Sequence, residues 1–333
     1  KVCNCISGES PAAPSLDETT VRLTADPQIY EEVAEYFVAI YRRVETQTGI
    51  RTYAFSLQNE PVFQQWYSSC VYSVDSYREV FKVVSERLNQ EGLGHVRWFG
   101  PEDVVANLIR YRQWVNLILQ DEVARVNMDV VAIHGLGTDG VTPYAPSATT
   151  WGHIRTEAAK YGKPVWDSEA YIADEADWPQ ALNDVRSLVQ GIRYGGVSGW
   201  LYAGNIDKAY VTSDGTGLRP GGHAARHIYR FVRPGAVHVA SLCDDDSVGV
   251  VAFNHPDNQC ITVVVMNDAH APRSVNLSGA GLPATMEGHL SSPGALSQEL
   301  GNAAPSGIEM PGQSMLTLVS GQYRHTGEYV SVQ

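Results

Sequence analysis

Two glutamates stand where the sequence predicts that buried strands end: Glu60 in the run QNEP and Glu169 in the run WDSEAY. Two carboxyl groups that face each other across a sugar are the machinery of glycosidic bond cleavage. One protonates the leaving oxygen while the other attacks the anomeric carbon, at a separation of about 5–5.5 Å in a retaining enzyme. The acid and the nucleophile must differ in pKa, which their surroundings have to arrange. The pair therefore predicts a hydrolytic site for glycans.

Polar and aromatic residues near the two glutamates are suited to hold a sugar. Asn59 precedes the acid and can donate from its amide to a hydroxyl beside the reacting carbon. Aromatic faces pack against the apolar face of a sugar ring, and Trp66, Tyr171 and Tyr202 lie at or just after strand ends. We predict these residues to line the substrate cleft.

His134 ends another strand on the same predicted face, and two interpretations stay open. It is either a ligand for a sugar hydroxyl or a structural histidine with its own partners. Because no partner ligand stands at a suitable spacing, we expect neither metal nor cofactor. Glu102 and Asp103 end the preceding strand, where they could bind sugar hydroxyls or tune Glu60 through charge.

Alternating helical and strand periods must position these residues. From about Asp26 to Lys208, strands are predicted at residues 51–60, 95–103, 128–136, 163–171 and 197–205, with helices between them. This order predicts parallel βα units, and in a closed (β/α)8 TIM-type barrel the strand ends form the catalytic face. A doubly wound sheet would need a glycine-rich phosphate loop, and the sequence has none.

The character of the chain changes after Ala236. Short runs rich in valine, threonine and serine alternate with turn residues, which predicts an antiparallel β-sandwich. We therefore divide the chain into a barrel catalytic domain at 1–235 and a β-sandwich side domain at 236–333.

Composition limits the partners. The formal net charge of −13 argues against nucleic acid and anionic membrane surfaces. No apolar run is long enough to span a bilayer. A serine hydrolase is disfavoured because no GxSxG elbow occurs. We expect a monomer whose partner is a β-linked glycan.

The five cysteines fit neither a zinc spacing nor a redox CxxC motif. Cys243 and Cys260 could bridge neighbouring strands, and Cys70 could meet Cys3 or Cys5. With a glycosylation sequon at 276–278, this favours a secreted or extracytoplasmic protein whose signal peptide is not in this chain.

Four segments resemble glycoside hydrolase family 30, of the clan A retaining hydrolases: SLQNEP, KPVWDSEA, VSGWLYAGN and IYRFVRPGAV. The resemblance runs from about Gln28 to Val319. It implies a (β/α)8 barrel with a side β-sandwich, Glu60 as acid/base on strand four, Asn59 as its neighbouring amide ligand, and Glu169 as nucleophile on strand seven.

The chain also departs from the family pattern. Strands four to eight are recognisable, whereas the N-terminal barrel strands are not, and an arginine expected from strand two has no candidate. Relatives place a tyrosine after strand six against the nucleophile; Leu136 stands at that point here, and Tyr144 is the candidate replacement. Ala203 stands where relatives commonly carry a tryptophan.

The sequence thus favours a retaining glycoside hydrolase that cleaves β-linked polysaccharides or oligosaccharides of the xylan, β-1,6-glucan or β-1,6-galactan type. The alternative is a catalytically silent glycan-binding protein on the same scaffold. A chain that needs further barrel strands to fold is a third possibility.

Overall fold

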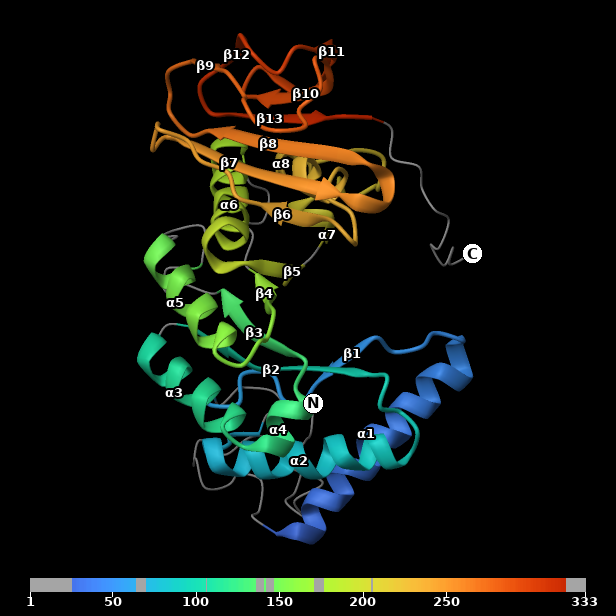
Figure 1. Ribbon diagram of the computed structural model, residues 1–333. Coiled ribbons are helices and arrows are strands. Elements are labelled where there is room, and N and C mark those ends of the chain that lie inside the picture. Colours follow the sequence, from blue (N-terminus) through green and yellow to red (C-terminus); the bar gives the residue numbers. More distant parts are fainter. Residues whose placement is uncertain are drawn as a thin grey trace. The chain divides into compact units, whose positions relative to one another are not determined.

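The computed structural model describes residues 26–63, 70–105, 107–135, 141, 147–170, 177–204 and 206–321 (Figure 1). Contacts group the chain into two compact units. One comprises Lys1–Ala170 and Tyr194–Tyr202, and the other comprises Tyr171–Arg193 and Ala203–Gln333. These units do not coincide with the predicted division at residue 235, which stays a prediction about domains.

The first unit carries a parallel sheet. Its strands are β1 (Ala54–Ser56), β2 (Arg97–Val104), β3 (Val130–Gly135), β4 (Val165–Ala170) and β5 (Val197–Tyr202), hydrogen-bonded in that order. Each corresponds to one of the five strands expected from the sequence. The sheet confirms the parallel βα pattern, and its polar ends fall at one edge because parallel strands all run the same way.

Helices α1 (Pro27–Thr48), α2 (Val74–Gln90), α3 (Leu108–Leu119), α4 (Glu122–Asn127) and α5 (Ala148–Ala159) belong to this unit (Figure 1). Between α1, α2 and the sheet, Trp98 of β2 packs against Phe37 and Phe81, with ring centroids 5.5 Å apart in both pairs. Trp98 is buried, as expected for a residue inside a strand. This apolar layer fixes the strands whose ends carry the candidate site.

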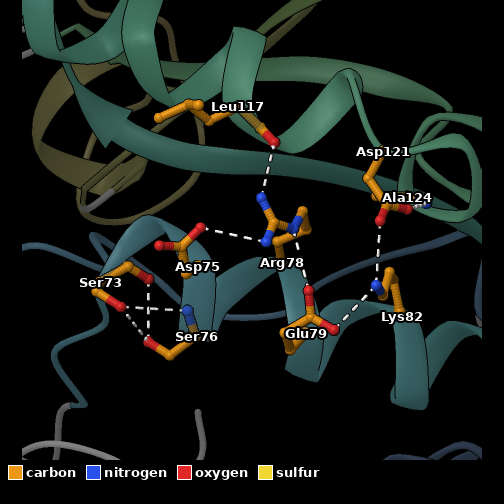
Figure 2. Close-up of polar contacts among 9 residues, drawn as sticks. All are labelled: Ser73, Asp75, Ser76, Arg78, Glu79, Lys82, Leu117, Asp121 and Ala124. Atoms are coloured by element: carbon orange, nitrogen blue, oxygen red, sulfur yellow. Dashed lines mark hydrogen bonds and ion pairs between the residues drawn. The ribbon is translucent and has the colours of Figure 1, made fainter.

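Polar contacts at the start and in the middle of α2 accompany the apolar layer (Figure 2). The Ser73 side chain accepts a hydrogen bond from Ser76 N at 3.2 Å and so caps the helix. Further along α2, Lys82 Nζ lies 2.9 Å from Glu79 Oε2 and 3.0 Å from Asp121 Oδ2. Asp121 is also the N-cap of α4, so this ion-pair chain joins the two helices.

The second unit is built on antiparallel strands. β6 (Val237–Val239), β7 (Val248–His255), β8 (Cys260–Asn267), β10 (Met286–Ser292), β11 (Ala295–Ala303) and β13 (Ser314–Val319) form one sheet, in the order β11-β10-β13-β8-β7-β6. β9 (Arg273–Val275) and β12 (Ile308–Met310) form a second, smaller sheet. The predicted antiparallel side domain is confirmed.

Helices α6 (Trp178–Gln190), α7 (Ile206–Ala209) and α8 (Pro220–Tyr229) also belong to the second unit. α6 packs on α8 and β7, and α8 packs on β10, β11 and β13. His227 of α8 is buried and bonds to Ser291 Oγ at 2.9 Å and Thr317 Oγ1 at 2.8 Å. This histidine therefore fastens α8 to the interior of the sheet.

The suggested bridge between Cys243 and Cys260 is wrong, since both are free thiols. Cys260 opens β8 and pairs with His255 in the β7–β8 ladder. Cys243 precedes β7 and packs at the margin of the sandwich core. The two thiols thus stand at opposite ends of β7. Cys3 and Cys5, the suggested partners of Cys70, lie outside the described residues.

We expected no membrane span from the sequence. In the parts of the chain that the structure describes, no helix combines the length and the apolar character that crossing a bilayer requires.

Candidate active site

Two strand ends of the parallel sheet carry glutamates in an unusual backbone conformation. Glu60 follows β1 with φ 47°, and Glu102 lies in β2 with φ 62°. Residues with a Cβ seldom occupy this left-handed region, and they persist there only when their surroundings support it. The backbone amide of Glu60 donates to the carbonyl of Glu102 at 2.9 Å, so the two turns support each other.

A bulge in β2 accounts for the direction of Glu102. In the ladder with β3, pairing passes from Pro101 opposite Ala132 to Asp103 opposite Ile133 and leaves out Glu102. A bulge of this kind re-aims the side chain of the extra residue. Its carboxylate accepts a hydrogen bond from Ser56 Oγ of β1.

A second irregularity sets the position of Glu169 in β4. Ile133 pairs with Asp167, but the next residue, His134, pairs with Glu169, so that Ser168 is skipped. If the two strands paired residue by residue without this skip, Ser168 would lie opposite His134. The irregularity therefore brings Glu169 beside the histidine.

The imidazole of His134 lies at the centre of these strand ends and has no exposed surface. Its Nδ1 is 3.2 Å from Glu60 Oε1 and 3.7 Å from Glu169 Oε2. Its Nε2 is 3.5 Å from Glu102 Oε1. One ring thus faces carboxylates from three neighbouring segments of the sheet, those of β1, β2 and β4.

The charge of His134 follows from these neighbours. Burial by itself lowers the pKa of the ring, but the interactions with Glu102 and Glu60, together with the charge of Glu169, outweigh it and raise the pKa of His134 to about 10. The ring is therefore a cation at neutral pH, with both nitrogens as donors. It offsets part of the negative charge that the carboxylates concentrate here.

Asp103, next to Glu102, has a different partner. Its Oδ2 lies 3.2 Å from Arg110 Nη2. Burial raises the pKa of Asp103, while Arg110 acts in the opposite direction. Asp103 is 3% exposed, so a direct role in binding a sugar hydroxyl has little surface to act through.

The two glutamates that the sequence singled out come together. Single side-chain atoms of Glu60, His134 and Glu169 all lie within 4.8 Å of one another. The Glu60 side chain is 7% exposed, whereas the Glu169 side chain is 33% exposed. The pair thus joins an enclosed carboxyl group to a more accessible one.

The other predicted site residues divide into two groups. Asn59 and Tyr202 are half-buried, Asn59 directly before Glu60 and Tyr202 at the end of β5. Trp66, Tyr144 and Tyr171, like Leu136, lie outside the described residues. The burial of His134, with both nitrogens facing carboxylates, favours its structural interpretation over direct contact with a sugar hydroxyl.

The expectation of no metal rested on sequence spacing, and the fold does bring three donor side chains together. A metal-binding imidazole must be neutral, however, and a metal ion here would have to displace the proton that His134 holds at neutral pH. We therefore interpret the cluster as an ion-pair network and assign no metal to it.

Comparison with known proteins confirms the resemblance stated from the sequence. Residues 235–318 match the family model described as the glycosyl hydrolase family 30 beta sandwich domain. Glucuronoxylanase XynC of Bacillus subtilis (strain 168) is 26% identical over 232 residues, which cover 65% of this chain and 48% of that protein. The chain thus spans about half the length of the curated relatives it matches.

Solved structures share the fold. A family 30 endoxylanase from Clostridium papyrosolvens C71 superposes with a TM-score of 0.72 at 23% identity, covering 90% of this chain and 73% of that one. The endo-β1,6-glucanase BT3312 gives a TM-score of 0.67 at 17% identity, covering 91% of this chain and 64% of that one. At these identities the likeness extends to the TIM-barrel and β-sandwich architecture.

Proposed function

The chain is related to glycoside hydrolase family 30, and from that premise we propose that it is a retaining hydrolase of β-linked glycans. The observation that carries the proposal is the approach of Glu60 and Glu169 to within 4.8 Å. Retaining enzymes hold their carboxyl groups about 5–5.5 Å apart, whereas inverting enzymes leave about 6.5–9.5 Å for a water molecule. The spacing supports double displacement.

The reaction would proceed in two steps. A carboxylate oxygen of Glu169 attacks the anomeric carbon, the glycosidic C–O bond breaks, and Glu60 gives its proton to the departing oxygen. In the second step water attacks the same carbon, Glu60 takes a proton from that water, and the ester bond to Glu169 breaks. The greater exposure of Glu169 suits the group that must reach the sugar.

Substrate choice is open within β-glycans. The curated relative is a glucuronoxylanase, and a structural neighbour is an endo-β1,6-glucanase. We therefore propose substrates of the xylan, β-1,6-glucan or β-1,6-galactan type. An extracytoplasmic location and a monomeric state complete the proposal and rest on the sequence alone.

Turnover of a β-glycan panel by the Glu60→Gln and Glu169→Gln variants tests the mechanism. We expect each variant to lose at least about 10³-fold in kcat with an unchanged circular dichroism spectrum, because each lacks a group that acts in the transition state. With the unaltered protein, NMR of the first products should show the same β configuration at the anomeric carbon as in the substrate. Tight glycan binding without any product from the unaltered protein would instead support the silent glycan-binding protein.

A further inference from the structure

We propose that Glu102 is a positioning residue that acts through His134 on the Glu60–Glu169 pair. Glu102 faces one nitrogen of the ring as an ion pair, while the other nitrogen lies at hydrogen-bonding distance from Glu60 and close to Glu169. The inference rests on the proposed function, because it assigns Glu102 a part in the same reaction.

The surroundings of Glu102 leave it no direct role with substrate. Its side chain is 11% exposed. Its Oε2 accepts the hydrogen bond from Ser56 Oγ, and its Oε1 faces His134 Nε2 at 3.5 Å. Both carboxylate oxygens are thus engaged by the protein, and any influence on a reacting sugar passes through the histidine.

The backbone around Glu102 is shaped for this contact. The residue combines a left-handed conformation with the extra position of a bulge, and a regular strand would place its side chain elsewhere. Left-handed conformations of this kind are energetically unfavourable for residues with a Cβ and tend to cluster at functional sites. In this conformation the carboxylate of Glu102 reaches Nε2 of His134.

The nitrogen of His134 that points away from Glu102 faces the two proposed catalytic carboxylates. His134 Nδ1 lies 3.2 Å from Glu60 and 3.7 Å from Glu169, so its N–H sits between the two carboxylates. Two carboxylates this close repel each other, and a fixed cation lowers the cost of ionising them. During turnover Glu60 gains and loses a proton while the charge on Glu169 disappears and returns. A ring held by Glu102 keeps its own charge and orientation through both steps.

Other titratable groups surround the cluster. From every described element packed against His134 and Glu102 they are Glu60, Asp103, Asp167, Glu169, Tyr77, Tyr111 and Arg110. Burial, followed by the charges of nearby carboxylates, raises the pKa values of Tyr77 and Tyr111, so both stay neutral in the working pH range. Arg110 is paired with Asp103. His134 Nε2 faces the carboxylate of Glu102.

The Glu102→Gln variant tests this role, since it keeps size and hydrogen-bonding capacity but removes the charge. We expect His134 to lose its proton at lower pH than in the unaltered protein. NMR of the ring nitrogens across the pH range measures this titration. The titration of His134 is the primary readout, because the ring still faces Glu60 and Glu169 in this variant and only the carboxylate at Nε2 has lost its charge.

Asp103→Asn is the matched control. It removes a buried negative charge at the adjacent position, but that charge faces Arg110 rather than His134. We expect His134 to stay protonated in this variant. An unspecific effect of deleting a buried carboxylate would instead make the two variants alike.

His134→Gln supplies a second test. If Glu102 acts through His134, the change that Glu102→Gln makes in kcat/KM should be much smaller in the His134→Gln background than in the unaltered protein. The proposal is overturned if His134 titrates in Glu102→Gln as it does in the unaltered protein, or if Glu102→Gln changes kcat/KM as much without His134 as with it. The NMR measurement needs no turnover, so it decides the link between Glu102 and His134 even if the unaltered protein proves inactive.

Discussion

His134 in the first unit and His227 in the second are both buried, with 0% and 2% of their surfaces exposed. His134 faces three carboxylates, and its pKa is raised to about 10 although burial opposes the charge. His227 contacts the hydroxyls of Ser291 and Thr317. Burial, and then the neighbouring His289 and His223, lower the pKa of His227 to about 3.

The difference teaches that burial does not by itself decide the charge of a histidine in this protein. Desolvation disfavours the cation in both places, and only the carboxylates around His134 reverse the result. The two rings consequently have opposite pH dependences. His134 contributes stability that is present below its ordinary pKa of 6.5 and is lost as pH rises through about 10, whereas the stability linked to neutral His227 is lost as pH falls below 6.5 towards about 3.

The largest effect is expected from His134→Ala. Removing the ring leaves Glu60 and Glu102 buried without their cation, and breaking a buried ion pair on one side costs about 3 kcal/mol or more. Urea unfolding at pH 7 measures the loss. Adding Glu102→Gln to this variant should recover part of it, because one of the unpaired charges is then gone. If the double variant is no more stable, the loss comes from the cavity rather than from charge, and the contrast with His227 weakens.

His227→Gln tests the neutral side of the comparison. Glutamine does not titrate, so the variant should escape the penalty that the unaltered protein meets at low pH. Between pH 7 and pH 5 the unaltered protein should lose about 2 kcal/mol relative to the variant, since this interval lies below the ordinary pKa and above the folded one. Urea unfolding at both pH values measures the difference. His223→Gln on the same helix is the control, with a smaller expected effect because that ring is only half-buried.

The smallest effect is expected from Lys82→Met. This change removes a cation that also bridges two carboxylates (Figure 2), but these side chains are partly exposed. Solvent and salt screen such pairs, so the free energy of unfolding should fall by no more than about 1 kcal/mol. Thermal melts at low and high salt measure this loss and its screening. A loss of stability comparable to that of His134→Ala would show that the difference in burial between the ion pairs of Lys82 and those of His134 does not set their contribution.

Much of the fold could be predicted from the sequence. Periodicity located the five parallel strands and the helices between them, since an element's hydrophobic pattern is local. Valine-rich runs with frequent turns predicted the antiparallel sheet. Glu60 and Glu169 were found because parallel strands bring their ends to one edge, whatever the distance between them in the chain.

Other features could not be read from local pattern. A bulge at Glu102 and a skipped Ser168 depend on how two ladders align, and a shift of one residue changes which side chain points into the site. Glu102 was visible in the sequence as a strand-end carboxylate, but nothing there connected it with His134. The separation of Cys243 from Cys260 likewise depends on strand register.

The sequence by itself determined which residue types reach the ends of the strands, because the order and period of the elements are written along the chain. Only the tertiary structure decided the charge of His134 and which side chains surround it. That charge is the sum of desolvation and the fields of carboxylates on three segments far apart in sequence, and such a sum exists only once the strands lie side by side.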